Sequence, residues 1–243
     1  MDLSAFPPFA VVLDGLHTVV VALGDAVEPL AGASSSALAV VLLTLLVRAL
    51  LVPVGVSQVR AEIGRRRLAP ALADLRRRIR DPQALQRATA ALYTSEKVSP
   101  LAGCLPTLAQ APVLTAVWSL FSHPLIAGHA NALLGHGLAG AALGATLVGS
   151  VGGGVAVVGP FAVLLVVLAV VVELRRRADL RAAGPAGSAT AQEAVPGLAT
   201  IARVVPFVSV VVAAFVPLAA ALYLVTSAAW TLGERALLRR LLA

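Results

Sequence analysis

Arg48 is the residue whose charge and apolar surroundings most clearly indicate a functional role. It lies within an apolar run, Leu42-Leu43-Thr44-Leu45-Leu46-Val47-Arg48-Ala49-Leu50-Leu51. A guanidinium group near the interior of a membrane is energetically costly, so it is expected to face water or a polar partner rather than lipid. Two interpretations stay open. Arg48 lies in a hydrated cavity and attracts acidic or polar polypeptide segments, or it snorkels to the interface near the end of its span.

The other reactive side chains form no recognisable catalytic or metal-binding pattern. The single cysteine, Cys104, excludes an internal disulfide, and the four histidines show no ligand spacing on one helix. Gly152-Gly153-Gly154 lacks the lysine and the Ser/Thr of a phosphate-binding P-loop. We therefore predict a protein that is not an enzyme and that uses no metal and no cofactor.

The composition indicates that the elements around Arg48 lie in a membrane. Of the 243 residues, 59% are hydrophobic and only 13% are charged, whereas a soluble domain carries about a quarter charged residues. The net charge is +7, and the 19 Lys and Arg residues are confined to position 48 and to 60–97, 175–203 and 235–240. Basic clusters between long apolar runs are typical of the positive-inside rule and not of a nucleic-acid-binding surface.

The apolar segments predict an all-α, polytopic membrane protein with a five-span helical bundle. The last uncharged stretch, 204–233, is longer than one crossing of a ~30 Å hydrocarbon core requires, and Pro217 offers a turn within it. The chain is predicted to begin with an external N-terminal segment (1–34), span 1 (35–59), a cytoplasmic helical hairpin (60–98) and span 2 (99–122). An external loop (123–155), span 3 (156–174) and a cytoplasmic linker (175–197) follow. Span 4 (198–216), span 5 (217–236) and a cytoplasmic tail (237–243) complete the order.

Local breaks support this division. The serines at 34–36 favour a helix start, and Pro53 is expected to bend or end the first span. The Asp81-Pro82 step divides the basic segment 60–97 into two helical halves. The three glycines at 152–154 are expected to precede the third span, and 181–197 has the composition of a flexible linker.

The N-terminal segment has the pattern of an amphipathic helix at a membrane interface. Apolar residues recur at helical spacing in 5–30, but several acids interrupt them. The apolar positions are Phe9, Leu13, Leu16, Val20 and Leu23. A weak transmembrane helix is the alternative.

The distribution of basic residues predicts the orientation. Segment 60–97 holds ten Lys or Arg residues against four acids, which favours the cytoplasmic side. All basic clusters fall on that side if the N-terminus is outside and the C-terminus is cytoplasmic. The predicted location is therefore the bacterial inner or plasma membrane, which the chain crosses several times.

Three segments resemble the YidC/Oxa/Alb family of membrane protein insertases. TLLVRALLVPVGVSQVRA at 44–61 is similar to the first core span, where an arginine precedes an apolar Leu-Pro segment. LQRATAALYTSEKVSPLAGCLPTLAQAPVLTAVWSLF at 85–121 resembles the approach to the second core span and that span itself, with PLAGCLP at 100–106 as the most specific match. VVPFVSVVVAAFVPLAAALYLVTSAAWTLGERALLRR at 204–240 resembles the closing pair of spans.

The resemblance implies a groove that is open to the cytoplasm and to lipid but closed toward the outside. Arg48 matches the arginine of that groove, and Thr44, Gln110, Glu173 and Tyr223 are expected to line it. The basic hairpin is expected to receive substrates through Arg65, Arg66, Arg67, Arg76, Arg77 and Arg78. Implied partners are nascent membrane proteins, the ribosome, the Sec translocon and the lipid bilayer, with no specific nucleic acid. The chain looks like the Gram-positive or actinobacterial form, which has no large periplasmic domain.

The chain departs from the family pattern in its last span. Pro217-Leu218-Ala219 stands where the family usually has Pro-small-Gly, and Tyr223-Leu224 and Ser227-Ala228 stand where Tyr-Trp and Ser-Asn are frequent. The groove is therefore expected to be less polar than usual. The predicted function is that of a membrane protein insertase or chaperone. The alternatives are a small anion or solute transporter with Arg48 as the binding charge, and an assembly factor that does not itself insert proteins.

Overall fold

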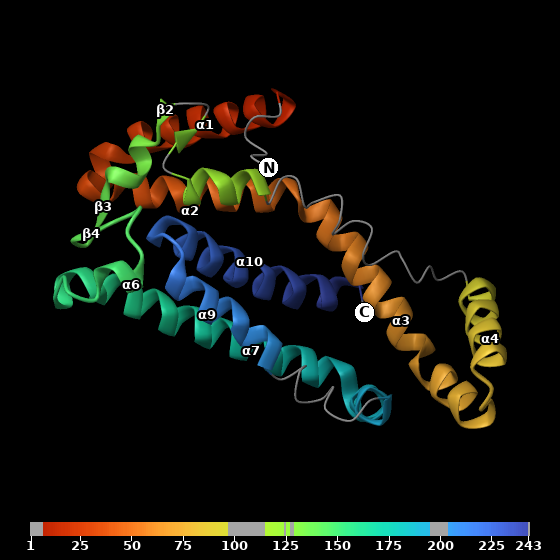
Figure 1. The fold of residues 1–243 in the computed structure, drawn as a ribbon. Coiled ribbons are helices and arrows are strands. Elements are labelled where there is room, and N and C mark those ends of the chain that lie inside the picture. Colours follow the sequence, from red (N-terminus) through yellow and green to blue (C-terminus); the bar gives the residue numbers. More distant parts are fainter. Residues whose placement is uncertain (1–6, 97–114, 124, 127–128, 195–203, 243) are drawn as a thin grey trace. The chain divides into compact units, whose positions relative to one another are not determined.

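The computed structural model describes residues 7–96, 115–123, 125–126, 129–194 and 204–242. This part of the chain is mostly helical, which confirms the all-α class (Figure 1). The helices are α1 (Pro7–Ala31), α2 (Ser35–Leu50), α3 (Val52–Arg78), α4 (Pro82–Ser95), α6 (Leu147–Ser150), α7 (Val155–Ala194), α9 (Val208–Phe215) and α10 (Leu218–Leu242), and 115–122 is also helical. The described residues also form the short 3-10 helices η2 (Gly32–Ser34), η3 (Ala132–Gly135) and η4 (Val205–Phe207).

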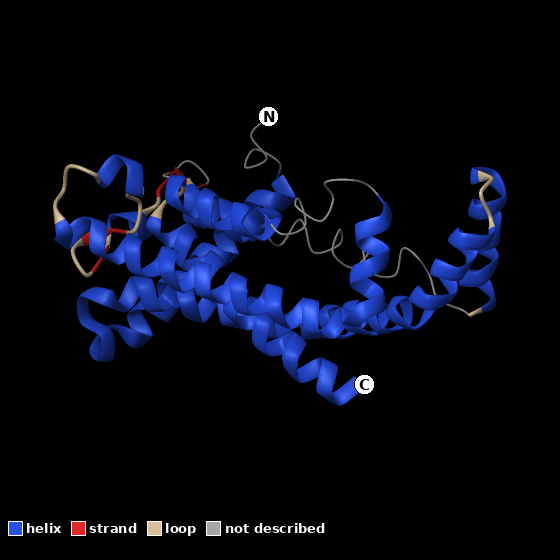
Figure 2. Cartoon of the chain, turned by 90° about the horizontal axis from the view of Figure 1, so that it is seen from below, coloured by secondary structure: helices blue, strands red, loops and turns tan. Residues whose placement is uncertain are grey.

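Short β-ribbons interrupt the helical pattern, and the sequence had not predicted them. Strand β1 (Leu125–Ile126) pairs antiparallel with β2 (His129–Ala130), and β3 (Gly137–Leu138) pairs antiparallel with β4 (Ala141–Ala142). Both ribbons lie within the loop predicted over 123–155 (Figure 2). The loop is thus a folded element rather than an irregular connection.

The chain divides into two compact units. The first contains 1–50, 111–173 and 207–231, and the second contains 51–110, 174–206 and 232–243. Arg48 belongs to the first unit, and the basic hairpin belongs to the second.

In the first unit, α1 and α2 form an antiparallel helical hairpin joined by η2 (Figure 1). Gly32 has a φ of +50°, a left-handed conformation that favours glycine. Leu13 and Val20 are buried, as the predicted apolar face of the N-terminal segment requires. Helix α2 begins at Ser35, which confirms the start that the serine run indicated.

Helices α7, α9 and α10 share an apolar core in the first unit. Leu168 and Val172 of α7 pack with Ala213 of α9 and with Ala221 and Val225 of α10. The opposite faces of α7 and α9 expose large apolar side chains. These are Val163, Val166, Val167 and Val170 on α7, and Val208, Val211, Val212 and Phe215 on α9. A helix that is apolar on all sides is typical of contact with lipid.

The 141–146 segment is attached to the start of α10 through backbone atoms. The Leu218 amide donates to the Ala145 carbonyl at 2.9 Å, and the Ala219 amide donates to the Leu143 carbonyl at 2.9 Å. Thr146 and Pro217 form an antiparallel bridge beside them. We call these contacts the 143–219 seam.

Asn131 fixes the same loop to the end of the helix at 115–122. Its side-chain amide is buried, and its Nδ2 donates to the carbonyls of Leu120, at 2.7 Å, and His123, at 3.1 Å. Leu120 belongs to the last turn and His123 directly follows it, where helical partners for the carbonyls are missing. The Asn131 side chain therefore acts as a C-terminal cap that is distant in sequence.

We expect Asn131→Asp to lower the free energy of unfolding by about 1–3 kcal/mol, because a carboxylate accepts but cannot donate to these two carbonyls. Thermal unfolding in detergent measures this loss. Thr18→Ala is the matched control, since Thr18 makes an exposed hydrogen bond to the Asp14 carbonyl in the same unit. Equal shifts for the two variants would contradict the capping role.

In the second unit, α3 and α4 form the predicted two-helix hairpin. Helix α3 ends at Arg78 and α4 begins at Pro82, which confirms the break at Asp81-Pro82. The Asp81 carboxylate accepts from the Ala84 amide at 2.7 Å, so it caps the first turn of α4. Proline at the first helical position needs no amide partner.

A helix break lies inside the predicted span 1 (35–59). Helix α2 ends at Leu50, and α3 begins at Val52 with Pro53 in its first turn. The effect expected of Pro53 is confirmed, because proline starts a helix more readily than it continues one. The hairpin's first helix therefore begins eight residues before the predicted boundary at 60.

The predicted linker over 175–197 is also wrong within the described residues. Helix α7 starts at Val155, directly after Gly154 with its φ of +75°, as the glycine run indicated. It then continues to Ala194. The glycine and proline at 184–185 suggested flexibility, but the segment is rich in alanine, which has the highest helix propensity.

Two described stretches are long and apolar enough to cross a membrane by length and composition. They are Leu13–Leu50 and Val155–Ala182. A third apolar helix, Val205–Phe215, is shorter. Most of the predicted second span lies outside the described residues.

Gly55 allows α3 to approach α10 closely in the second unit. A Cβ placed on Gly55 would lie 2.1 Å from Oε1 of Glu234. Because that oxygen is the far end of a flexible side chain that can move aside, we expect Gly55→Val to lower the free energy of unfolding by no more than about 1 kcal/mol. A thermal melt of the double variant Gly55→Val/Glu234→Ala should recover most of this loss, and absence of recovery would rule out the steric explanation.

Candidate functional site

Arg48 lies in the last turn of α2 and reaches across to α10. Its Nη2 donates a hydrogen bond to the Ser227 hydroxyl, and the guanidinium is partly buried. Among the described residues, Arg48 forms no ion pair with a carboxylate. The partner of Arg48 in the first unit is therefore an uncharged hydroxyl, and no described carboxylate there balances the charge of Arg48.

Ser227 and Tyr223 supply the polar face of α10 that meets Arg48. Both are buried, at 5% and 7% exposure, and they lie one helical turn apart. The Tyr223 hydroxyl contacts Ser227 and lies within the field of the Arg48 charge. The Tyr223 ring packs on Phe121, with ring centroids 6.1 Å apart. Arginine, serine and tyrosine thus form one polar cluster on an apolar base.

The structure brings some of the predicted groove residues together. Arg48 and Tyr223 are close in space, as expected. Thr44 is buried one turn before Arg48, and its hydroxyl donates to the Val40 carbonyl of its own helix at 2.7 Å. Glu173 is partly buried on α7, and its place in a groove stays a prediction. Gln110 lies outside the described residues.

Sequence reasoning did not identify Ser227 as the partner of Arg48. In the sequence, Ser227 is notable only as part of a departure from the family pattern. The available signal was the spacing of Tyr223 and Ser227. Two polar residues four apart in an uncharged stretch share one helix face.

The six arginines of the predicted receiving hairpin differ in their surroundings. Five of them are exposed on α3: Arg65, Arg67, Arg76, Arg77 and Arg78. The sixth, Arg66, pairs with Glu62 and donates to the Ala182 carbonyl of α7 at 2.7 Å. Five arginines are therefore available on the surface, whereas Arg66 has a structural role.

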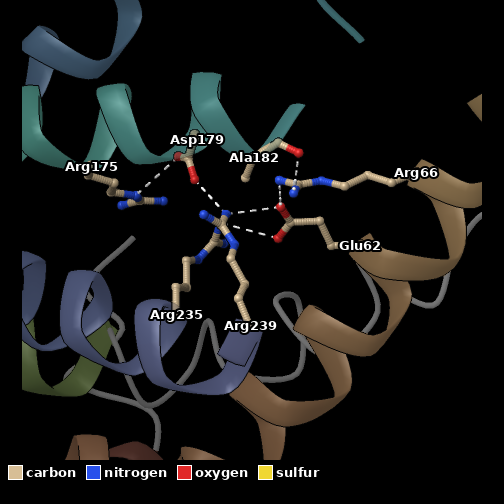
Figure 3. A network of polar contacts seen from close by, with 7 residues as sticks. All are labelled: Glu62, Arg66, Arg175, Asp179, Ala182, Arg235 and Arg239. Carbon is tan, nitrogen blue, oxygen red and sulfur yellow. Dashed lines mark hydrogen bonds and ion pairs between the residues drawn. The ribbon is translucent and has the colours of Figure 1, made fainter. Parts of the chain in front are cut away.

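A larger charged cluster lies in the second unit, where α3, α7 and α10 meet (Figure 3). We call it the Glu62 cluster; its members are Glu62, Arg66, Arg175, Asp179, Arg235 and Arg239. Arg239 is central, with its Nη2 3.0 Å from Oε1 of Glu62 and 2.6 Å from Oδ1 of Asp179. Arg235 lies 3.6 Å from Glu62, and Arg175 lies 3.9 Å from Asp179. The sequence had not predicted this cluster.

The two carboxylates of the cluster hold Arg239 in its charged form. Burial alone would lower the pKa of Arg239, but the hydrogen bond to Asp179 and the charges of Glu62 and Asp179 outweigh it and raise the pKa above its ordinary value. The side chain is only 17% exposed, so solvent screens these contacts less than it screens a surface ion pair. The cluster is thus a network of ion pairs that connects three helices.

The chain matches the model of the 60Kd inner membrane protein family over residues 27–243. The chloroplastic inner membrane protein PPF-1 of Pisum sativum is 34% identical over 116 residues, which is 47% of this chain and 26% of that protein. The membrane protein insertase YidC of Clostridium perfringens is 37% identical over 82 residues, 33% of this chain and 34% of that protein. The membrane protein insertase YidC of Aeromonas hydrophila is 43% identical over 84 residues, 34% of this chain and 15% of that protein. The matches thus span about a third or less of the length of these relatives.

Proposed function

Because the chain belongs to the 60Kd inner membrane protein family, also described as the YidC/Oxa/Alb family, we propose that it acts as a membrane protein insertase. The observation that carries the proposal is the partly buried Arg48, whose hydrogen-bond partner is the Ser227 hydroxyl and not a carboxylate. An arginine in such a site keeps an attraction for the acidic or polar flank of an entering polypeptide. The relatives named as insertases support the same conclusion.

The proposed topology has five spans, with the N-terminus outside and the C-terminus in the cytoplasm. The spans centre on α2, on the helix that ends at 122, on α7, on α9 and on α10. This arrangement puts the basic residues of α3, α7 and α10 on the cytoplasmic side, in agreement with the positive-inside rule. In it, the 143–219 seam lies on the outer side and closes the groove there. Helix α1 lies at the outer interface.

Insertion begins, in this proposal, when a nascent chain meets the exposed arginines of α3. The hydrophilic flank then enters the groove, where the Arg48 charge acts more strongly than it would in bulk water. The polar segment crosses a shorter hydrocarbon path, so less of it is desolvated at once. The apolar segment moves into lipid along the exposed valines of α7, where burial of apolar surface contributes about 25 cal/mol per Å². No nucleotide hydrolysis is required.

The experiment that tests the function is insertion of a single-span protein with a short acidic flank into proteoliposomes that contain only this chain. Protection of the flank from added protease measures insertion. We expect insertion well above that of liposomes without protein. Insertion that occurs only when the Sec translocon is also present would favour the assembly factor. Uptake of a small anion without protein insertion would favour the transporter.

A further inference from the structure

A cavity of about 400 Å³ lies in the first unit, away from Arg48. Its walls come from the last turns of α1, from η2 and the start of α2, and from the loop segment that holds η3 and His136. Strand β3 of this loop lies against η2, so the turn between α1 and α2 meets the folded loop here (Figure 1). A volume of this size is typical of sites for small organic molecules.

Two acids of α1 line the cavity. Asp25 and Glu28 are three residues apart, so they lie on one face of the helix, close enough for one ligand group to reach both. Neither forms an ion pair with a described residue, and both side chains are exposed. The described walls contain no lysine or arginine. The cavity therefore offers two acidic acceptors and no lysine or arginine to balance them.

The end of α1 adds to the negative potential of the cavity. Helix α1 ends at Ala31, and Glu28 lies in its last turn, which contains no basic residue. The free carbonyls at the C-terminus of a helix carry a partial negative charge, which favours a cation there and disfavours an acid. Glu28 is therefore next to a helix end of like sign. A bound cation would offset both.

Ser36 gives a separate indication of a ligand. It lies in the first turn of α2, lines the same cavity and is only 7% exposed. Its hydroxyl forms no hydrogen bond within the part of the chain that the structure describes. A buried hydroxyl usually has a partner, and this one can accept a hydrogen bond from a donor in the cavity.

The residue types of the walls distinguish between possible cations. Among the described residues, no three acidic, histidine or cysteine side chains are arranged to hold a metal ion. A quaternary ammonium is bound by aromatic rings, and the described walls contain no Phe, Tyr or Trp. A primary ammonium instead has three N–H donors, which suit carboxylates and a hydroxyl. Val20 and Leu133 supply apolar wall for an attached carbon chain.

We propose that this cavity binds the primary ammonium group of a small organic cation with a short apolar body. The ammonium donates to Asp25, Glu28 and Ser36, and the carbon chain lies against Val20 and Leu133. The ligand contacts α1, α2 and the loop, so it stabilises the attachment of the loop to the helical hairpin. The ammonium of a phospholipid headgroup fits less well, because its phosphate would meet the acids without a lysine or arginine in the described walls.

Isothermal titration calorimetry of the full chain in detergent, with n-pentylamine as the probe, tests this assignment. Pentyltrimethylammonium keeps the charge but not the N–H donors, and 1-pentanol lacks the charge. We expect n-pentylamine to bind at least about ten-fold more tightly than either, because hydrogen bonds between charged groups are lost in both. Asp25→Asn should weaken its binding about five-fold, and Ser36→Ala about three-fold.

Asp14→Asn is the matched control, because Asp14 is an exposed acid of α1 that does not line the cavity. It should leave the affinity for n-pentylamine unchanged. Melting temperatures measured in parallel identify any variant that has lost its fold.

Several outcomes would overturn the proposal. They are the absence of n-pentylamine binding, equal affinity for pentyltrimethylammonium, and equal losses in Asp25→Asn and Asp14→Asn, which would indicate diffuse surface charge. Displacement of n-pentylamine by micromolar Mg²⁺ would assign the carboxylates to a metal. Tighter binding of short-chain phosphatidylethanolamine would assign the ammonium to a lipid headgroup. The titration requires no insertion activity, so this proposal and the proposed function fail independently.

Discussion

Arg48→Ala is expected to reduce insertion of an acidic-flanked, single-span test protein at least ten-fold, whereas Arg48→Lys should retain most of the activity. Two opposite charges 4 Å apart at an effective dielectric constant near 20 attract by about 4 kcal/mol before desolvation offsets part of it. If a third of this attraction remains after desolvation, the occupancy of the groove by the acidic flank changes about ten-fold. Protease protection in proteoliposomes gives the measurement.

Two further variants separate the charge of Arg48 from its contacts. Ser227→Ala removes the hydroxyl that accepts from Arg48 but leaves the charge in place, so insertion should continue. Arg60→Ala removes an exposed arginine of α3 and is the matched control for net charge. If Arg48→Ala inserts as well as the wild type does, Arg48 snorkels to the interface. The groove must then act through shape and hydration.

Glu62→Gln is expected to have the largest effect on stability, with a loss of about 2–3 kcal/mol in the free energy of unfolding. Glu62 accepts hydrogen bonds from Arg66 and Arg239 and forms an ion pair with Arg235, and its side chain is 20% exposed. Removal of one partner from a fully buried ion pair costs about 3–5 kcal/mol, and partial exposure reduces that cost. Thermal unfolding in detergent measures the change.

Asp74→Asn is the matched control for Glu62→Gln. Asp74 is an exposed acid on the same helix, and its neutralisation should change stability by less than about 0.5 kcal/mol. High salt should reduce the difference in unfolding free energy between the two variants only partly, because dissolved ions have little access to the Glu62 cluster. Equal melting temperatures for both variants would show that the Glu62 contacts are energetically neutral.

The sequence predicted the places where helices begin and end better than it predicted their contacts. Pro53, Asp81-Pro82, Gly154 and Pro217 all mark real boundaries. Proline and glycine act on the backbone at their own position, so the helix boundaries that they cause can be predicted from the nearby sequence alone. The linker was predicted wrongly because glycine and proline were given more weight than the many alanines around them.

The partners of the charged residues could not be found in the same way. Arg48 and Ser227 are 179 positions apart, and Arg239 lies 177 positions from Glu62. Tertiary packing alone brings such residues together. The resemblance to a family assigned Arg48 and Tyr223 to one expected groove, but the Glu62 cluster matched no motif and became visible only in the folded chain.

The 143–219 seam consists of main-chain hydrogen bonds, so it constrains chain length more than residue identity. A substitution at Ala145 leaves its carbonyl in place to accept from Leu218. An insertion or deletion between 141 and 146 would instead shift every donor relative to its acceptor. Homologues are thus free to diverge in side chains along this strip while keeping its spacing. A main-chain contact of this kind can persist through extensive sequence drift.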